Sequence, residues 1–280
     1  MDRIWFITGT SSGFGREIAR AALAAGDRVV ATARRTDGLA DLVEQAPDRV
    51  RAVAVDVTDP AAVRAAVDIA VAEFGRIDVL VNNAGYGSRG ALEELSDEQV
   101  RAQFDVNVFG VLDVLRAVLP VMRAQRSGHV VQMSSVGGVI ATLGGAAYAA
   151  TKFALEGLSE GLAVEVAPLG IRVTLVEPGP FRTDFAGRSA AHGEPVEDYA
   201  LILDPAREWF LAQDGQQPGD PARAAQAIVD LVGLDDPPVR LPLGAAAFDR
   251  IRARLSTRLA DLDAVEPLGR DTDFASEPAG

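Results

Sequence analysis

From residue 3 to about residue 177, short runs of β-branched residues alternate with longer stretches that are rich in alanine. The apolar runs show little polar alternation, which is typical of strands buried on both faces of a parallel sheet. Six strands are predicted in this way, at Ile4–Thr8, Val29–Ala33, Ala52–Val55, Val79–Asn82, Val130–Ser134 and Val173–Val176. Repeated strand–helix–strand units predict an α/β fold, in which a doubly wound parallel sheet lies between two helical layers and binds ligands at the carboxyl ends of its strands.

Sequence signals for helix starts support this pattern. Asp59-Pro60 and Asp220-Pro221 each place a capping carboxylate before a proline, and Ser96 with Gln99 resembles a capping box. The 280 residues, of which 48% are hydrophobic, are enough for one large domain with a sizeable core. We therefore expect a single domain over residues 1–280.

The alternation breaks near residue 180. Residues 180–220, here called the lid segment, are rich in Gly, Pro and acidic residues but also contain Phe185, Trp209 and Phe210. Because linkers are poor in aromatic residues, this segment is interpreted as an irregular lid over a binding site. A C-terminal extension over about residues 244–280 is expected to begin with an Arg-rich helix at residues 245–262. Residues 264–280 are expected to fray, apart from whatever Phe274 anchors.

The composition excludes several classes of function. A net charge of −13 and a pI near 4.6 argue against nucleic acid and anionic membranes as partners. The chain has no Cys and only His129 and His192, which rules out disulfides, thiolate metal sites and multi-histidine metal sites. The N-terminus enters a strand at once, and no apolar run reaches the ~18 residues of a membrane span. A cytoplasmic location is therefore expected.

A glycine-rich stretch, Thr8-Gly9-Thr10-Ser11-Ser12-Gly13-Phe14-Gly15, joins the first predicted strand to the first helix. Glycines permit a tight turn and close backbone approach, and the start of a helix offers free N–H groups to a pyrophosphate. A glycine-rich stretch alone is often only a turn, but here the strand–turn–helix context that such a site needs is present.

One lysine stands out among the 27 basic residues, because all the others are arginine. Lys152 follows Tyr148 by four residues, and on a helix that spacing puts both side chains on one face. Arginine cannot replace an ammonium group at such a place, since its planar fork is larger and does not give up a proton. The pair is either an accident of composition or a site where a phenol and an ammonium group share a ligand.

The loop spacing TGxxxGxG and the pair Tyr148/Lys152 resemble the short-chain dehydrogenase/reductase family, in its non-extended type. Further matches are the segment Asn82-Asn83-Ala84-Gly85 and the segment Pro178–Thr183, which is similar to the family's PGxxxT motif. The resemblance covers the chain from Ile4 to about Asp184 and implies a Rossmann-type fold. It also implies a catalytic set made of Asn107, Ser135, Tyr148 and Lys152.

The chemistry of hydride transfer accounts for these residue types. Reducing a carbonyl leaves an alkoxide that needs a proton, and a free tyrosine, with a pKa of ~10, ionises too reluctantly to work in both directions. A cation within a few Å lowers that pKa by ~1–3 units, and Lys152 is expected to supply it. The resemblance further implies that Ser135 holds the substrate oxygen, that Lys152 binds the nicotinamide ribose, and that Asn107 holds a water linking Lys152 to solvent. Because successive strand residues point to opposite faces, only one of Ser134 and Ser135 should reach the site, and the spacing of thirteen residues before Tyr148 favours Ser135.

The end of the second strand is where such folds distinguish the two dinucleotides. Ala33 stands where NAD-binding relatives carry Asp, and Arg34-Arg35 follow, which favours the 2′-phosphate of NADP(H). Two alternatives remain: both arginines are surface charges, or Asp37 is the ribose acid and the cofactor is NAD(H). The predicted cofactor-binding residues are Gly9, Ser11, Ser12, Gly13, Phe14, Gly15, Arg34, Arg35, Asp56, Val57, Asn83, Ala84, Gly85, Tyr148, Lys152, Pro178, Gly179, Phe181 and Thr183.

The sequence therefore predicts an NADPH-dependent oxidoreductase that acts on a carbonyl or secondary alcohol of a bulky hydrophobic substrate. Within the family, the chain is most similar to the branch of 17β-hydroxysteroid-dehydrogenase-like and retinal-reductase-like proteins. The alternative from another class is a non-catalytic NADP-binding sensor or scaffold. A sugar-nucleotide epimerase is disfavoured by the loop spacing. The resemblance also implies a homodimer or homotetramer, built through helices near residues 100–120 and 148–167.

Overall fold

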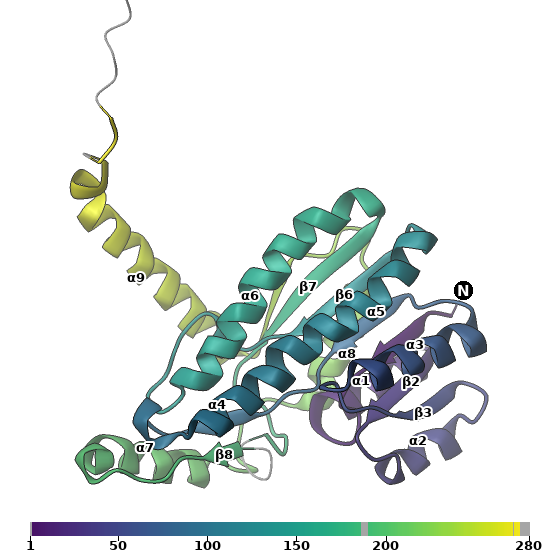
Figure 1. Cartoon of the computed structure of the whole chain (residues 1–280), viewed down its shortest axis with the longest axis horizontal. Helices are drawn as coiled ribbons and strands as arrows, with labels where there is room; N and C mark the ends of the chain where they lie inside the picture. Colours follow the sequence, from purple (N-terminus) through teal and green to yellow (C-terminus); the bar gives the residue numbers. More distant parts are fainter. Residues whose placement is uncertain (1, 186–189, 271, 275–280) are drawn as a thin grey trace, which may run out of the picture.

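The computed structural model describes residues 2–185, 190–270 and 272–274. Over these residues, seven parallel strands form one sheet in the order β3-β2-β1-β4-β6-β7-β9 (Figure 1). The strands are β1 Ile4–Ile7, β2 Arg28–Ala33, β3 Val50–Ala54, β4 Val79–Asn82, β6 Gly128–Met133, β7 Ile171–Pro178 and β9 Arg240–Leu243. The strand order reverses between β1 and β4, and this is where open sheets of this kind bind ligands.

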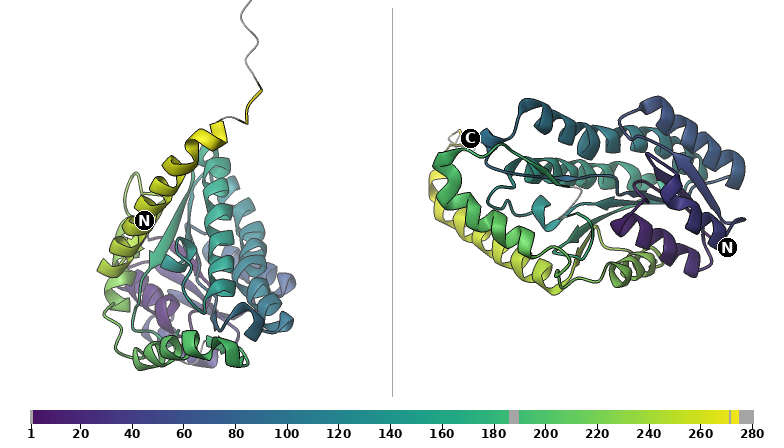
Figure 2. Two further views of the ribbon diagram at one scale, coloured as in Figure 1. Left: turned by 90° about the vertical axis from the view of Figure 1, so that its left-hand side faces the viewer. Right: turned by 90° about the horizontal axis from the view of Figure 1, so that it is seen from below.

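Helices cover both faces of the sheet, as the sequence predicts (Figure 2). Helices α1 (Gly13–Ala24) and α8 (Pro221–Val232) pack on one face, together with the short α2 (Ala40–Gln45). Helices α3 (Pro60–Phe74), α5 (Gly110–Gln125) and α6 (Ala146–Val166) pack on the other. Neighbouring strand residues feed the two cores alternately: Trp5 and Ile7 face the α1 side, and Phe6 faces the α5 side.

The predicted helix caps are confirmed. Asp59 accepts hydrogen bonds from the backbone of Ala61 and Ala62 at the start of α3, and Asp220 caps α8 in the same way. Ser96 and Gln99 form a reciprocal capping box at the start of α4 (Asp97–Phe104). These side chains satisfy N–H groups that a helix start would otherwise leave free, which is why local sequence predicts them well.

The lid segment is more regular than the sequence predicts. It contains a short strand, β8 (Ala190–His192), which pairs in parallel with β5 (Gly87–Arg89), and a helix, α7 (Ala200–Ala212). Pro205 lies inside that helix, and a proline in this position normally indicates a helix end. This is the reason that the sequence pattern reads as irregular. Residues 186–189 of the predicted lid lie outside the described residues.

The C-terminal extension forms one helix, α9 (Ala245–Arg270), which leaves the body of the molecule (Figure 1). Only its first turns are buried, through Ala247 and Ile251, while Leu268 near its end is exposed. The prediction of fraying from residue 264 is wrong as far as Arg270, and the described Phe274 is fully exposed rather than an anchor. Positions 271 and 275–280 lie outside the described residues. Within the described residues, no helix combines a bilayer-spanning length with a sufficiently apolar sequence.

Candidate active site

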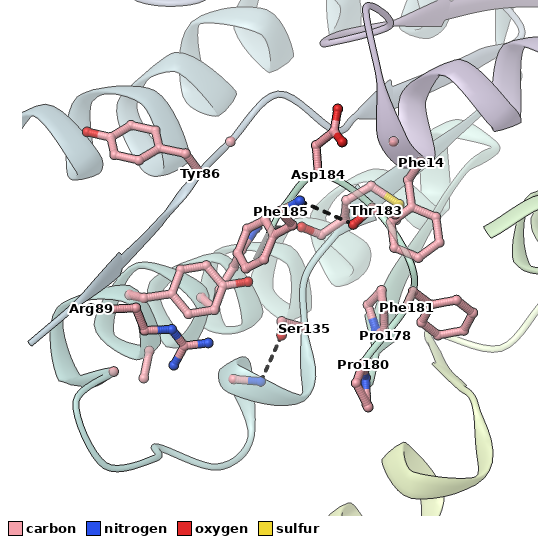
Figure 3. A pocket seen from close by; sticks show the side chains of 18 of the residues that line it. Phe14, Tyr86, Arg89, Ser135, Pro178, Pro180, Phe181, Thr183, Asp184 and Phe185 are labelled. Atoms are coloured by element: carbon pink, nitrogen blue, oxygen red, sulfur yellow. Dashed lines mark hydrogen bonds between the residues drawn. The ribbon is translucent and has the colours of Figure 1, made fainter. Parts of the chain in front are cut away.

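A cavity of about 1550 Å³ opens at the carboxyl ends of the central strands. It is larger than the ~300–1,000 Å³ of a typical small-molecule pocket, so it has room for more than one ligand. Most of the predicted site residues line it: Gly9, Ser11, Ser12, Gly13, Phe14, Arg34, Asp56, Val57, Asn83, Ala84, Gly85, Ser135, Tyr148, Lys152, Pro178, Gly179, Phe181 and Thr183. Figure 3 shows part of this lining, with Phe14, Ser135 and Phe181 around the pocket.

Three predicted residues, Gly15, Arg35 and Asn107, do not line the cavity. Gly15 contributes through its missing side chain, because a Cβ there would lie 2.4 Å from the Gly9 carbonyl oxygen and 2.5 Å from Asn83 Nδ2. That amide nitrogen donates hydrogen bonds to the carbonyls of Thr8 (2.9 Å) and Gly9 (3.0 Å). Gly15 therefore allows β4 and the glycine-rich loop to close against each other.

The glycine-rich loop forms a cradle for an anion at the start of α1. Gly9 and Gly13 have φ values of 70° and 56°, a conformation that other residues rarely adopt. Among the described residues, no side chain caps the N-terminus of α1 and its first turn holds no acid. Free N–H groups and the positive end of the helix dipole therefore face the cavity, and they fit the pyrophosphate of a dinucleotide.

The end of β2 separates the two arginines. Arg34 is exposed and lines the cavity, while Arg35 turns away and forms an ion pair with Asp37. Arg35 Nε lies 3.2 Å from Asp37 Oδ2, and neither residue lines the cavity. Across the cavity, Asp56 accepts hydrogen bonds from the Thr58 backbone and hydroxyl, and these bonds and nearby Arg34 lower its pKa. Arg35 therefore lies off the cavity, paired with Asp37, and its predicted contact with the cofactor stays a prediction.

Tyr148 and Lys152 lie on one face of α6 and both line the cavity, as their spacing predicts. Lys152 Nζ lies 5.9 Å from the centre of the Tyr148 ring and donates a hydrogen bond of 2.7 Å to the Met133 carbonyl. Burial lowers the pKa of Lys152 to about 8, against the opposing effect of Glu156. Burial raises the pKa of Tyr148, and the groups that oppose this rise are Ser135 and Arg89. In this arrangement the ammonium group is turned to the Met133 carbonyl, and the predicted effect of Lys152 on the pKa of Tyr148 stays a prediction.

The two neighbouring serines have different roles. Ser135 caps a short 3-10 helix at Val136–Gly138, and its hydroxyl accepts a hydrogen bond of 3.0 Å from the Gly137 backbone at the edge of the pocket (Figure 3). The Ser134 hydroxyl instead donates to the buried carboxylate of Glu156. Both serines line the cavity, but the Ser134 hydroxyl is engaged by Glu156, and the choice of Ser135 as the substrate-binding hydroxyl stays a prediction.

Asn107 is fully engaged by the protein. It lies in a π-helical turn, Asp105–Phe109, which interrupts the long helix predicted here; that helix also continues past Pro120 to Gln125. The side-chain amide donates to the Tyr86 carbonyl (2.9 Å) and to the Thr151 hydroxyl (3.1 Å) and accepts from the Tyr86 backbone N–H (3.1 Å). Asn107 thus braces the neighbours of the site, and its role in holding a water stays a prediction.

A buried acidic cluster lies next to Lys152. Glu156 receives hydrogen bonds from Ser134 and from Arg240 Nε, which lies 3.2 Å from Glu156 Oε2 and 3.5 Å from Glu177 Oε1. Burial and the neighbouring Glu156 together raise the pKa of Glu177 to about 7, against the opposing effect of Arg240. No sequence motif announces this cluster, because its members come from α6, β7 and β9.

The other half of the cavity lies on the lid side. For this half the sequence predicts an apolar wall but does not identify the residues that form it. The Tyr148 and Phe185 rings lie 5.4 Å apart, and the Arg89 guanidinium lies 3.9 Å from the centre of the Phe210 ring. Arg89 comes from β5, and Phe210 comes from α7. The aromatic content of the lid segment is the only sequence signal for this wall, and it does not identify the residues that form it.

The sequence model of the family described as short chain dehydrogenase matches residues 3–193, which is more than half of the chain. The chain belongs to the short-chain dehydrogenase family. Oxidoreductase BOA17 from Botryotinia fuckeliana is 43% identical over 250 residues, covering 89% of this chain and 91% of that relative. A short-chain dehydrogenase from Streptomyces avermitilis has a similar structure, with a TM-score of 0.92, 48% identity and coverage of 98% and 100% of the two chains.

A third similar protein is an alcohol dehydrogenase from the archaeon Thermococcus sibiricus, solved with 5-hydroxy-NADP. It has a TM-score of 0.71 and 28% identity, with coverage of 87% of this short-chain dehydrogenase and 96% of that chain. Family membership makes the present chain an oxidoreductase that uses a nicotinamide dinucleotide. The anion cradle at α1 is consistent with such a cofactor.

Proposed function

We propose that this short-chain dehydrogenase is an NADPH-dependent carbonyl reductase, equivalently a secondary-alcohol dehydrogenase, with a bulky hydrophobic substrate. The observation that carries the proposal is the shared cavity: Tyr148, Ser135 and Lys152 line the same space as the glycine-rich cradle. A reacting carbonyl can therefore meet acid, hydrogen-bond donor and nicotinamide at one point.

In this mechanism Ser135 donates a hydrogen bond to the substrate carbonyl oxygen and orients it. The cofactor, when bound, supplies the hydride that reduces the carbonyl carbon. Tyr148 then gives its phenolic proton to the oxygen, and in the oxidation direction it takes that proton back. Lys152, placed one helical turn away, stabilises the tyrosinate that proton transfer leaves. Asn107 keeps the backbone beside the site in place, and we retain its predicted link to a water as part of the proposal.

The preference for NADP rests on the end of β2. Arg34 faces the cavity beside the buried Ala33, where an acid would repel a 2′-phosphate. The rival interpretation needs Asp37 as the ribose acid, but Arg35 already holds that carboxylate away from the cavity. A titration of NADPH and NADH by intrinsic fluorescence tests this point. At least tenfold tighter binding of NADH, about 1.4 kcal/mol, would exclude the role given to Arg34.

The substrate preference rests on the apolar wall opposite the cradle. Its large apolar side chains come from the loop before α6 and from the lid segment, and they are Leu143, Phe185, Leu203, Trp209, Phe210 and Leu211. Several of them remain exposed without a ligand, including Trp209 at 63%. Exposed aromatic groups around a cavity are a usual sign of a surface that a ligand covers.

Oxidation of NADPH with a panel of aryl and alicyclic ketones tests the function as a whole. Tyr148→Phe removes only the acidic proton, so turnover should fall by about 10²- to 10⁴-fold while NADPH binding stays within a factor of three. Binding of NADPH without any turnover that depends on Tyr148 would instead indicate a sensor or scaffold.

A further inference from the structure

Arg89 is a cation built into the substrate half of the cavity. It is the last residue of β5, which follows β4 after a short turn, and its backbone carbonyl accepts a hydrogen bond of 2.9 Å from Gly193 in the lid segment. The side chain lines the cavity, and Figure 3 shows its guanidinium on the side of the pocket where Ser135 lies. The pairing of β5 with β8 therefore fixes the position of the Arg89 backbone.

The guanidinium stacks on an aromatic ring and is partly withdrawn from water. It lies 3.9 Å from the centre of the Phe210 ring, and a Cβ on Gly145 would lie 3.4 Å from its Nη1. Burial lowers the pKa of Arg89, against the opposing effect of Tyr148. Stacking of this kind holds the planar fork in one orientation and leaves its N–H edge available.

Within the described residues, the Arg89 guanidinium forms no ion pair and no hydrogen bond to another side chain. The nearby buried acid, Glu94, is already taken: Arg207 pairs with it, and the backbone N–H groups of Ala91 (2.7 Å) and Val196 (3.0 Å) donate to it. Arg89 is therefore a half-desolvated charge for which the described part of the chain supplies no counter-charge, an arrangement that costs free energy unless a ligand completes it.

The cofactor does not provide this counter-charge. Its phosphates belong at the cradle at the start of α1, and Figure 3 shows Phe14 of that cradle and Arg89 on opposite sides of the pocket, with Phe185 between them. Tyr148 is in ring contact with Phe185 and is close enough to Arg89 for the two groups to influence each other's pKa. The group that meets Arg89 must therefore arrive with the substrate.

We infer that Arg89 is a specificity-determining residue that binds a carboxylate of the substrate. The preferred substrate class is then an amphiphilic keto acid, or the matching hydroxy acid, with an apolar body against the lid segment and its carboxylate paired to the Arg89 fork. The geometry of a guanidinium favours a planar carboxylate, which it binds through two parallel hydrogen bonds. This inference rests on the proposed function and narrows its substrate from hydrophobic ketones in general.

Binding and turnover are measured separately, so that the two proposals can fail independently. The probes are 2-oxo-4-phenylbutanoate and 4-oxo-4-phenylbutanoate, which place the carboxylate at two distances from the carbonyl, and the methyl ester of each. Their affinity for the NADPH complex is measured in the Tyr148→Phe background from NADPH fluorescence, where no reaction consumes the cofactor. The ratio of kcat/KM for acid and ester is measured in the otherwise unchanged enzyme.

At least one acid should bind tenfold or more tightly than its ester. Arg89→Gln should weaken binding of that acid by about 10- to 100-fold and change the ester by less than threefold. Arg89→Lys keeps the charge but loses the planar fork, so its affinity for the acid should lie between that of the Arg89 protein and that of Arg89→Gln. It serves as the second variant if Arg89→Gln does not fold. Arg250→Gln removes an exposed charge at the rim of the same cavity, and the preference for the acid should survive it.

Equal binding of acids and esters, or a preference for the acid that survives Arg89→Gln, would overturn the inference and leave the proposed reductase intact. If Arg250→Gln also lost the preference for the acid over the ester, the inference about Arg89 would be overturned. General attraction between the carboxylate and the positive charges of the cavity would then explain the preference. Tight, Arg89-dependent binding of the acid without any turnover would support the carboxylate-binding role of Arg89 and contradict the proposed reductase function.

Discussion

The two halves of the cavity are built from different material. The cofactor half is built mainly from backbone, namely a glycine-rich loop, the start of α1 and the ends of neighbouring strands, with the Arg34 side chain beside them. The substrate half consists of side chains, such as Arg89, Phe185 and Phe210, which come from β5 and the lid segment. A backbone site is tied to one fold and one kind of ligand, whereas a side-chain site is altered by single substitutions. This difference explains why one family serves many substrates with one cofactor chemistry.

Helix α6 lies at the boundary of the two halves, and the largest effect is expected there. Lys152→Arg preserves the charge but replaces a compact buried ammonium group with a larger fork that cannot donate to Met133 from the same place. We expect kcat to fall at least 100-fold, about 2.7 kcal/mol in the barrier, with NADPH bound within a factor of ten. Steady-state kinetics checks this. Normal turnover would mean that the lone lysine is an accident of composition.

In the backbone half, Gly15→Ala should impair both cofactor binding and folding. The new Cβ would lie 2.4 Å from the Gly9 carbonyl oxygen, so the loop must move away from β4. We expect NADPH to bind about 10- to 100-fold more weakly and the free energy of unfolding to fall by about 1–3 kcal/mol. Gly157→Ala is the matched control, because nothing lies within 4 Å of its Cβ on exposed α6 surface. It should raise stability by about 0.5–1 kcal/mol and leave NADPH binding unchanged.

The halves should also differ in their response to pH. Lys152 has a pKa of about 8, so it is charged below pH 8 and loses its charge above it. The kcat/KM for reduction should therefore fall by about tenfold for each unit above pH 8, while the Kd for NADPH, whose phosphates are bound by backbone N–H groups and Arg34, stays flat between pH 7 and 9. A flat kcat/KM profile up to pH 9.5 would show that the Lys152 charge is not required.

The smallest effect is expected in the lid segment. Phe210→Ala removes the ring that supports Arg89 and part of the apolar wall, and it should raise KM about fivefold, roughly 1 kcal/mol, with NADPH affinity unchanged. Leu201→Ala on the same helix is the control, because Leu201 is 94% exposed and does not line the cavity. Equal effects of the two substitutions would mean that α7 acts as a whole rather than through its inner face.

The features built from local backbone could be predicted from the sequence, and most side-chain contacts could not. Six of the seven strands of the large sheet, the caps at Asp59 and Asp220 and the residues of the cradle were predictable because each depends on a few neighbouring residues. Strand β9 was missed because it is four residues long and contains Pro242, which is typical of edge strands. Helix α7 was hidden by its internal proline.

The side-chain contacts could not be predicted for another reason: their partners are far apart in the chain. Arg240 reaches Glu156 across 84 residues, and β5 meets α7 across more than a hundred. Position along a single sequence contains no signal for such pairs. The spacing of Tyr148 and Ser135 did locate the pocket wall, because one helix and one strand end determine it.

Helix α6 places Tyr148, Lys152, Glu156 and Glu160 in one row at intervals of four residues, and the row runs from the cavity to the exposed contact between Glu160 and Arg240. Each interval spans about 6 Å along the axis, so the spacing of these side chains is set by the geometry of the helix and not by the conformation of any loop. The lid segment pairs with β5 through β8 and contacts α6 through the Phe185 ring against Tyr148. Because Tyr148 and Lys152 both lie on α6, a lid segment taken from a relative would change which substrate is bound and leave the spacing of these two groups unchanged.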